Sequence, residues 1–176
     1  MGKIERKFMA HFIDATFQFT GVGEEITWTP NWYRLGEDLE EYVVEMNPIG
    51  EVEKNILDDD VAILTGYDLK GEADTFYAYN NDALFAKLQN IIDNCSTGAS
   101  CLTLALEVQL WHGRSSGGSD GSGEFTAVLR PCMVIPGGYG GDTSGYQIPF
   151  EVSYLNNFTK YGYFATDGSG SGTFVT

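Results

Sequence analysis

Strict alternation of apolar and polar residues is the feature that most limits what this chain can fold into. Residues 102–111 and 146–154 each place an apolar side chain at every even position. Successive side chains of a strand point to opposite faces, so this period of two predicts half-buried strands. Residues 13–20 alternate in the same way, and residues 8–12 before them are expected to belong to the same strand. Residues 39–46 and 125–135 also favour strands, the last with Pro131 at an edge or bulge.

Helical spacing is evident in one place, residues 81–94. Asn81 is the predicted N-cap, and Asp82 would lie at the positive end of the helix dipole. The expected apolar stripe consists of Leu84, Phe85, Leu88, Ile91 and Ile92. Roughly seven to nine strands and one helix predict a mainly β fold. We expect a β-sandwich or partly open barrel with one flanking α-helix, formed by residues 1–176 as a single domain.

Turn-forming residues separate these segments. Residues 47–50 read as a turn, and residues 47–61 as an acidic hairpin or loop whose end is Asp58-Asp59-Asp60. Residues 115–123 consist mostly of glycine and serine, which predicts a flexible hairpin loop between two strands.

Charge is unevenly distributed along the chain. The formal net charge is −15, and residues 24–74 alone hold 15 acidic and three basic side chains. Residues 1–7 form a basic N-terminal arm with Lys3, Arg6 and Lys7. So acidic a protein is a poor candidate for binding nucleic acid or anionic lipid by charge attraction. The simplest interpretation of the acidic segment is a solvated face, but the opposed signs also allow one copy's arm to lie on the next copy's acidic segment.

Sites of chemistry are hard to find in this sequence. The two histidines, His11 and His112, accompany no nucleophile motif, and no phosphate-binding loop or calcium-loop spacing occurs. We therefore expect no catalytic residue, cofactor or metal. The three cysteines form an odd set without ligand spacing, which favours reduced, mostly buried thiols in a cytoplasmic protein. No stretch approaches the ~20 apolar residues of a membrane helix, and the N-terminus does not look like a secretory signal.

Several segments, in order and over nearly the whole chain, resemble the major tail protein, or tail tube protein, of long non-contractile-tailed bacteriophages. They are KFMAHFIDA (7–15), YRLGEDLEE (33–41), EMNP (45–48) with EKNIL (53–57), ADTFYA (73–78) leading to DALFAKL (82–88), and GGDTSGYQIPF (140–150). The chain departs from the family after Leu57, where the family often continues Gly-Glu into a strand and Asp58-Asp59-Asp60 stands here.

The resemblance implies a virion protein of the phage tail, assembled in the cytoplasm of the bacterial host. In this family, whose fold is a β-sandwich with a flanking helix, six copies form a ring, and rings stack around a channel that conducts double-stranded DNA during ejection. The partners it implies are further copies of the chain, the tape-measure, tail terminator and distal tail proteins, and passing DNA that is not bound specifically, with no membrane involved.

Two groups of residues are candidates for this role. An acidic channel wall would keep the duplex from adhering, because DNA carries one negative charge per ~1.7 Å of its axis. The candidates for that wall lie on polar faces of predicted strands and are Glu41, Glu45, Glu107 and Glu151. The candidates for contacts between subunits are Lys3, Arg6 and Lys7 on one copy and Glu51, Glu53, Asp58, Asp59 and Asp60 on the next.

Two other classes of protein remain open. A carbohydrate-binding β-sandwich module would stack sugars on surface aromatics such as Trp28, Trp32, Tyr33 and Trp111 and would stay monomeric. A small hydrolase would need two carboxylates converging in a pocket, which a sequence cannot reveal.

Overall fold

The computed structural model describes residues 3–21, 25–36, 39, 41–54, 56–113, 122–166 and 171–176, without the side chains of Arg6 and Asn157. Most of the predicted 115–123 loop therefore lies outside the described residues. The elements are η1 (Arg6–Phe8), β1 (Met9–Asp14), β2 (Trp32–Leu35), β3 (Val43–Glu45), β4 (Pro48–Lys54), β5 (Asp60–Tyr67), β6 (Lys70–Ala73), α1 (Ala83–Asn94), η2 (Gly98–Cys101), β7 (Leu102–Gly113), β8 (Gly123–Pro136), β9 (Gly140–Asp142), β10 (Gly145–Gln147), β11 (Phe150–Tyr154), η3 (Asn156–Phe158), β12 (Lys160–Thr166) and β13 (Gly172–Val175).

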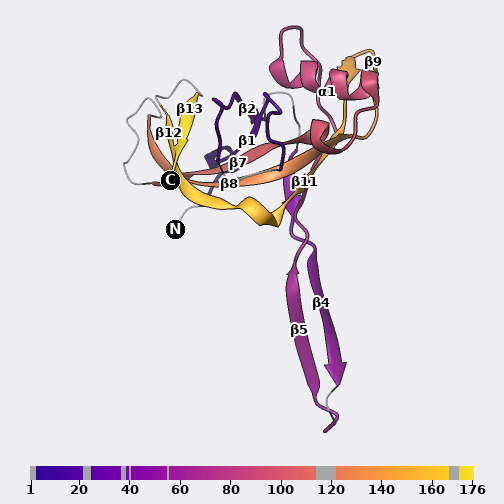
Figure 1. The fold of residues 1–176 in the computed structure, drawn as a ribbon, viewed down its shortest axis with the longest axis vertical. Helices are drawn as coiled ribbons and strands as arrows, with labels where there is room; N and C mark the ends of the chain where they lie inside the picture. The colour runs from indigo at the N-terminus through magenta and orange to yellow at the C-terminus, as the bar shows by residue number, and fades with distance from the viewer. Residues whose placement is uncertain are drawn as a thin grey trace.

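One antiparallel sheet of nine strands dominates the molecule, with seven of them in the order β2-β1-β7-β8-β11-β6-β3. The sheet curls like part of a barrel, and α1 lies at one end of it (Figure 1). The predicted mainly β class with one flanking helix is confirmed, and of the two predicted architectures the partly open barrel is the nearer. Two-stranded sheets β4-β5 and β9-β10 complete the fold.

The long strand β8 joins the two halves of the main sheet. Along one edge it pairs with β7, while along the other it pairs first with β12, up to Leu129, and then with β11, from Cys132. Pro131 stands where the partner changes, and its carbonyl accepts a hydrogen bond from the Leu155 amide at 2.8 Å. Pro131 was predicted at a sheet edge or bulge, and this is wrong. An interior strand accepts proline here because no ladder bond requires its missing N–H.

The sheet buries residues on both faces, in different places. On one face the even-numbered residues of β7 pack with β1, β8 and β12 in a cluster that includes Phe12, Leu106 and Phe164. On the other face a second cluster gathers residues of β8 and β11, such as Val134 and Val152, beneath the helix. The alternation that predicted strands 102–111 and 146–154 therefore reports real burial, although Ile148-Pro149 interrupts the second stretch between β10 and β11.

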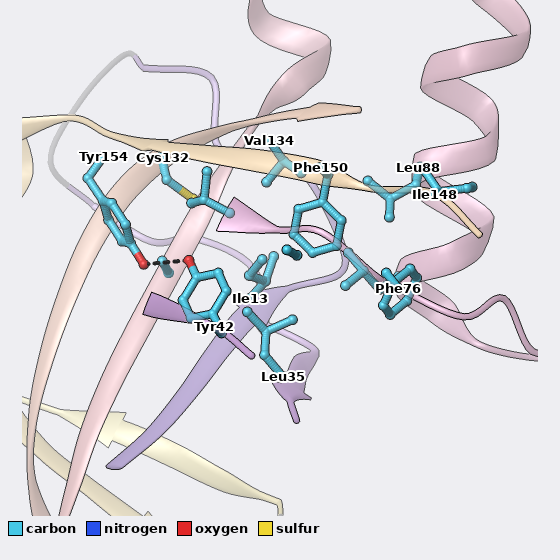
Figure 2. Packing of buried hydrophobic residues seen from close by; sticks show 14 residues of the cluster. Ile13, Leu35, Tyr42, Phe76, Leu88, Cys132, Val134, Ile148, Phe150 and Tyr154 are labelled. Carbon is cyan, nitrogen blue, oxygen red and sulfur yellow. Dashed lines mark hydrogen bonds between the residues drawn. The ribbon is translucent and has the colours of Figure 1, made fainter. Parts of the chain in front are cut away.

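Helix α1 begins at Ala83, because Asp82 and not Asn81 is its N-cap. The Asp82 side chain accepts hydrogen bonds from the backbone amides of Leu84 and Phe85, while Asn81 has a positive φ of 73°. The helix ends at Asn94, and its C-cap, Cys95, adopts the left-handed conformation. The predicted apolar stripe is confirmed, with Leu84, Leu88 and Ile91 buried. In Figure 2 the side chain of Leu88 meets Ile148 at the end of the core beneath the helix.

The first predicted strand, residues 13–20 with residues 8–12 before them, is confirmed in its first part and wrong at its end, because β1 runs from Met9 to Asp14. Residues 15 and 16 form a turn and residues 17–21 belong to no strand, with Phe17 at a positive φ of 51°. Asp14 was predicted on a polar face, yet it is fully buried. Its carboxylate accepts hydrogen bonds from the amide and hydroxyl of Thr16, the indole of Trp28 and the amide of Asn31, at 2.8–3.0 Å. Asp14 thus fastens residues 28–31 to the end of β1.

The predicted acidic hairpin is present and longer than predicted. Residues 47–50 were expected to form a turn, but Pro48 already begins β4, because Asn47 makes the change of direction with a positive φ of 39°. The strand predicted at residues 39–46 is reduced to β3. Figure 1 shows β4 and β5 extending together away from the main sheet. We call residues 48–67 the projecting hairpin.

The core beneath the helix contains a buried pair of tyrosines. The hydroxyl groups of Tyr42 and Tyr154 lie 2.8 Å apart and are hydrogen-bonded (Figure 2). Burial, and next the neighbouring Tyr42 and Glu107, raise the pKa of Tyr154 well above its usual value. Burial also raises the pKa of the Cys132 thiol beside them. Both groups therefore favour the protonated form in the folded protein.

This pair predicts a loss of stability in alkali. The unfolded chain releases the Tyr154 proton near pH 10 whereas the folded chain retains it, so the stability present below pH ~10 falls above it by up to ~1.4 kcal/mol per pH unit. Unfolding by urea at pH 8–11 should show a shallower fall for Tyr154→Phe than for wild type. Tyr161→Phe is the matched control, because that ring is exposed. Equal slopes for Tyr154→Phe and wild type would contradict the assignment.

Candidate functional site: the open face of the sheet

One face of strands β8, β11, β6 and β3 is not covered by either core cluster. Strand pairing sets two rows of side chains across it. In the first row Val43 lies opposite Glu72, Glu72 opposite Glu151, and Glu151 opposite Ile135. The second row consists of Glu45, Lys70, Ser153 and Met133. These eight residues, which we call the open face, are all exposed or half-buried, while the residues alternating with them in β8 and β11 are buried.

The open face is acidic and its charges are only partly balanced. Three carboxylates share it with one lysine, and the Lys70 ammonium lies 3.7 Å from a carboxylate oxygen of Glu151. The Ser153 hydroxyl donates a hydrogen bond of 2.9 Å to the same oxygen. Glu72 lies directly opposite Glu151 in the ladder, an arrangement of like charges that costs stability. The exposed side chains of Val43 and Ile135 lie beside them, so the surface is partly charged and partly apolar.

Two of the four predicted channel residues, Glu45 and Glu151, share the open face. Glu107 does not, because it lies on the opposite side of the sheet, where its carboxylate pairs with Arg130 and lies 3.9 Å from the buried His11 imidazole. The Glu107 side chain is only 14% exposed, so its carboxylate interacts with neighbouring residues of the same chain and not with a channel. Glu41 is exposed but precedes β3, so its placement on a strand was wrong.

Sequence reasoning missed Glu72 and Lys70. Both belong to β6, a strand of four residues. So short a strand gives no measurable period, and its position between β11 and β3 depends on pairing with segments distant in the sequence. The charges of residues 70 and 72 alone do not distinguish an open sheet face from a loop.

The predicted inter-subunit residues lie in two separate places. Lys3 and Lys7 are exposed at the N-terminus, where Lys7 pairs with Glu5 at 2.6 Å, and Arg6 lies in η1. The acidic candidates are exposed along the projecting hairpin, where Lys54 pairs with Asp58 at 2.8 Å. They comprise Glu51 and Glu53 in β4, Asp58 and Asp59 in the turn, and Asp60 at the start of β5. Within one chain, therefore, the N-terminal pair Lys7–Glu5 and the hairpin pair Lys54–Asp58 each join residues of the same segment.

Most of the residues considered for sugar binding or catalysis make contacts within the fold. The Trp28 indole donates a hydrogen bond to Asp14, and the Tyr33 hydroxyl donates one to Asp82. Trp32 packs on the core. Of the four aromatic residues considered for sugar binding, Trp111 is the exposed one. His112 Nδ1 lies 2.7 Å from the Thr126 hydroxyl.

Cys95 is exposed while Cys101 and Cys132 are buried, and all three thiols are free. Within the described part of the chain, no group of three or more His, Cys, Asp or Glu side chains is placed to hold a metal ion. Among the described helices, none is long and apolar enough to cross a membrane.

No protein-family model matches the chain, and no curated protein matches its sequence.

Proposed function

We propose that the chain is a structural subunit of a phage tail tube, in which stacked six-membered rings enclose an acidic channel for double-stranded DNA. The observation that supports this most is the open face. A curled sheet that leaves one surface uncovered, with Glu45, Glu72 and Glu151 on it, is suited to forming part of a wall in contact with water and passing polyanions.

The charge arrangement agrees with a conduit and not with a binding site. Screening over ~8 Å at physiological salt makes repulsion local, so carboxylates at the wall act on the duplex while those on the outside do not. The unfavourable juxtaposition of Glu72 and Glu151 costs the isolated chain stability. Such a cost is understandable where the surface must repel a polyanion instead of holding it.

The first test is whether the protein polymerises. Purified protein, concentrated and imaged by negative-stain electron microscopy, is expected to show rings with a central hole and, at higher concentration, tubes. Size-exclusion chromatography with light scattering should show the matching oligomers. A preparation that remains monodisperse and monomeric at every concentration would contradict the proposal and favour a monomeric binding module.

A further inference from the structure

The projecting hairpin exposes many large apolar side chains. Every residue of β4 is exposed, and so is every residue of β5 except Gly66. Its two strands pair with each other in a two-stranded sheet of their own. A lone hairpin is marginally stable in water, and exposed apolar clusters mark interaction surfaces. The large apolar residues exposed on it are Ile49, Val52, Ile56, Leu57, Val61, Ile63, Leu64 and Tyr67.

The register of the hairpin gives its two faces different characters. One face holds the pairs Gly50–Leu64 and Val52–Ala62, which are apolar, and the charged pair Lys54–Asp60 at its far end. On the other face Glu51 lies opposite Ile63 and Glu53 opposite Val61, so carboxylates run along one strand and branched apolar side chains along the other. We call this second face the striped face. A complementary surface would interleave cations with apolar side chains.

Such a surface exists at the N-terminal end of the same chain. Lys3, Ile4, Lys7 and Phe8 are exposed there, and Ile4 retains 56% of its accessible surface. The guanidinium of Arg34, on the neighbouring strand β2, lies 3.5 Å from the Lys7 carbonyl. We call Lys3, Ile4, Lys7, Phe8 and Arg34 the basic patch. The exposed carboxylate of Glu5, which pairs with Lys7 at 2.6 Å, lies beside it. Together with Arg6, whose side chain is not described, the basic patch gathers four of the ten basic residues of a chain with net charge −15.

The hairpin and the basic patch belong to opposite ends of the strand order. The hairpin joins β3 to β6 at one end, whereas the patch is formed by β2 and the segment that precedes β1 at the other. The hairpin also extends away from the main sheet of its own chain (Figure 1). A contact between two different surfaces of identical chains is heterologous, and repeats of it produce closed rings or open filaments.

We infer that the striped face of the projecting hairpin docks on the basic patch of a second copy of this chain. This inference rests on the proposed function, since it names the contact by which copies in the tube are joined. Single exposed ion pairs contribute only ~0–1 kcal/mol, so the apolar residues between the charges and the repetition of the contact around a ring must supply the remaining affinity.

Exchange of charge between the two surfaces tests the contact. Glu51→Lys with Glu53→Lys, and separately Lys3→Glu with Lys7→Glu, should each raise the critical concentration for rings and tubes at least tenfold at low salt. A fourfold variant that carries both pairs of substitutions in one chain should restore the critical concentration to within about threefold of that of wild type. Asp74→Lys with Asp93→Lys is the matched control, because both carboxylates are exposed away from the hairpin.

The outcomes separate this inference from the function on which it rests. Wild-type-like assembly of both double variants would overturn the docking and leave the tube intact. Loss of assembly in both without rescue in the fourfold variant would also overturn it, because the hairpin would then contact another surface. A wild-type protein that never assembles would overturn the tube and the docking together. Thermal unfolding of each variant establishes that the substitutions have not unfolded the body.

Discussion

Replacement of Asp14 by alanine is expected to lower the free energy of unfolding by about 3–5 kcal/mol. The change removes a fully buried carboxylate and leaves the four hydrogen-bond donors of Thr16, Trp28 and Asn31 without their acceptor. Each unsatisfied buried donor costs about 1–3 kcal/mol, and the removed bonds involve a charged acceptor. Urea unfolding followed by circular dichroism measures the loss, with tryptophan fluorescence reporting on Trp28.

A milder variant keeps this prediction testable if the alanine protein does not fold. Asp14→Asn retains one oxygen acceptor but turns an amide toward two of the donors, so we expect an intermediate loss. Asp93→Ala is the matched control, because that carboxylate is exposed and accepts a single bond from Gln89. A loss below about 1 kcal/mol for Asp14→Ala would mean that the residue does not organise this end of the sheet.

Reversal of charge on the open face is expected to make an assembled tube retain DNA. Glu45→Lys, Glu72→Lys and Glu151→Lys together turn three carboxylates and one lysine into four cations, which attract a duplex through its phosphates. Sedimentation of tubes with a fluorescent linear duplex at low salt should show at least tenfold more retained DNA than wild type. Added salt should release it, because binding of this kind depends on counterions.

The matched control for this experiment makes the same change of net charge elsewhere. Glu25→Lys, Asp74→Lys and Asp93→Lys alter three exposed carboxylates outside the open face. If this control retains as much DNA as the open-face variant, net charge and not position governs retention, and the open face is not the channel wall. If the open-face variant assembles but retains no DNA, the same conclusion follows.

The sequence predicted the parts of the fold that depend on local periodicity. The strand over residues 102–111 and the apolar stripe of α1 are both present in the structure. Both elements are long enough for the spacing of their apolar residues to indicate which side is buried. The burial of Asp14 could not be predicted in this way, since its partner Trp28 lies 14 residues away in the sequence. Periodicity predicts which face of a strand is polar. It does not predict whether another part of the chain packs over that face.

The candidate site shows the same limit. Glu107 and Glu151 occupy equivalent positions in two well-predicted alternating strands, yet they lie on opposite sides of the sheet. Which side stays open is decided by pairing of β11 with β6 and of β1 with β7, contacts between segments distant in sequence. In the basic patch, Lys3 and Lys7 were predicted as contact residues and Arg34 was not, because Arg34 reaches the N-terminal segment only through the pairing of β1 with β2.

The double partnership of β8 makes this strand intolerant of insertions and deletions. Loss or gain of one residue near Pro131 would keep the half bonded to β12 in frame and invert the half bonded to β11. Cys132 and Val134 would then turn outward among the glutamates, while Met133 and Ile135 would enter the core. Relatives that diverge in length are therefore expected to do so in the projecting hairpin, where extra pairs of residues change only its reach.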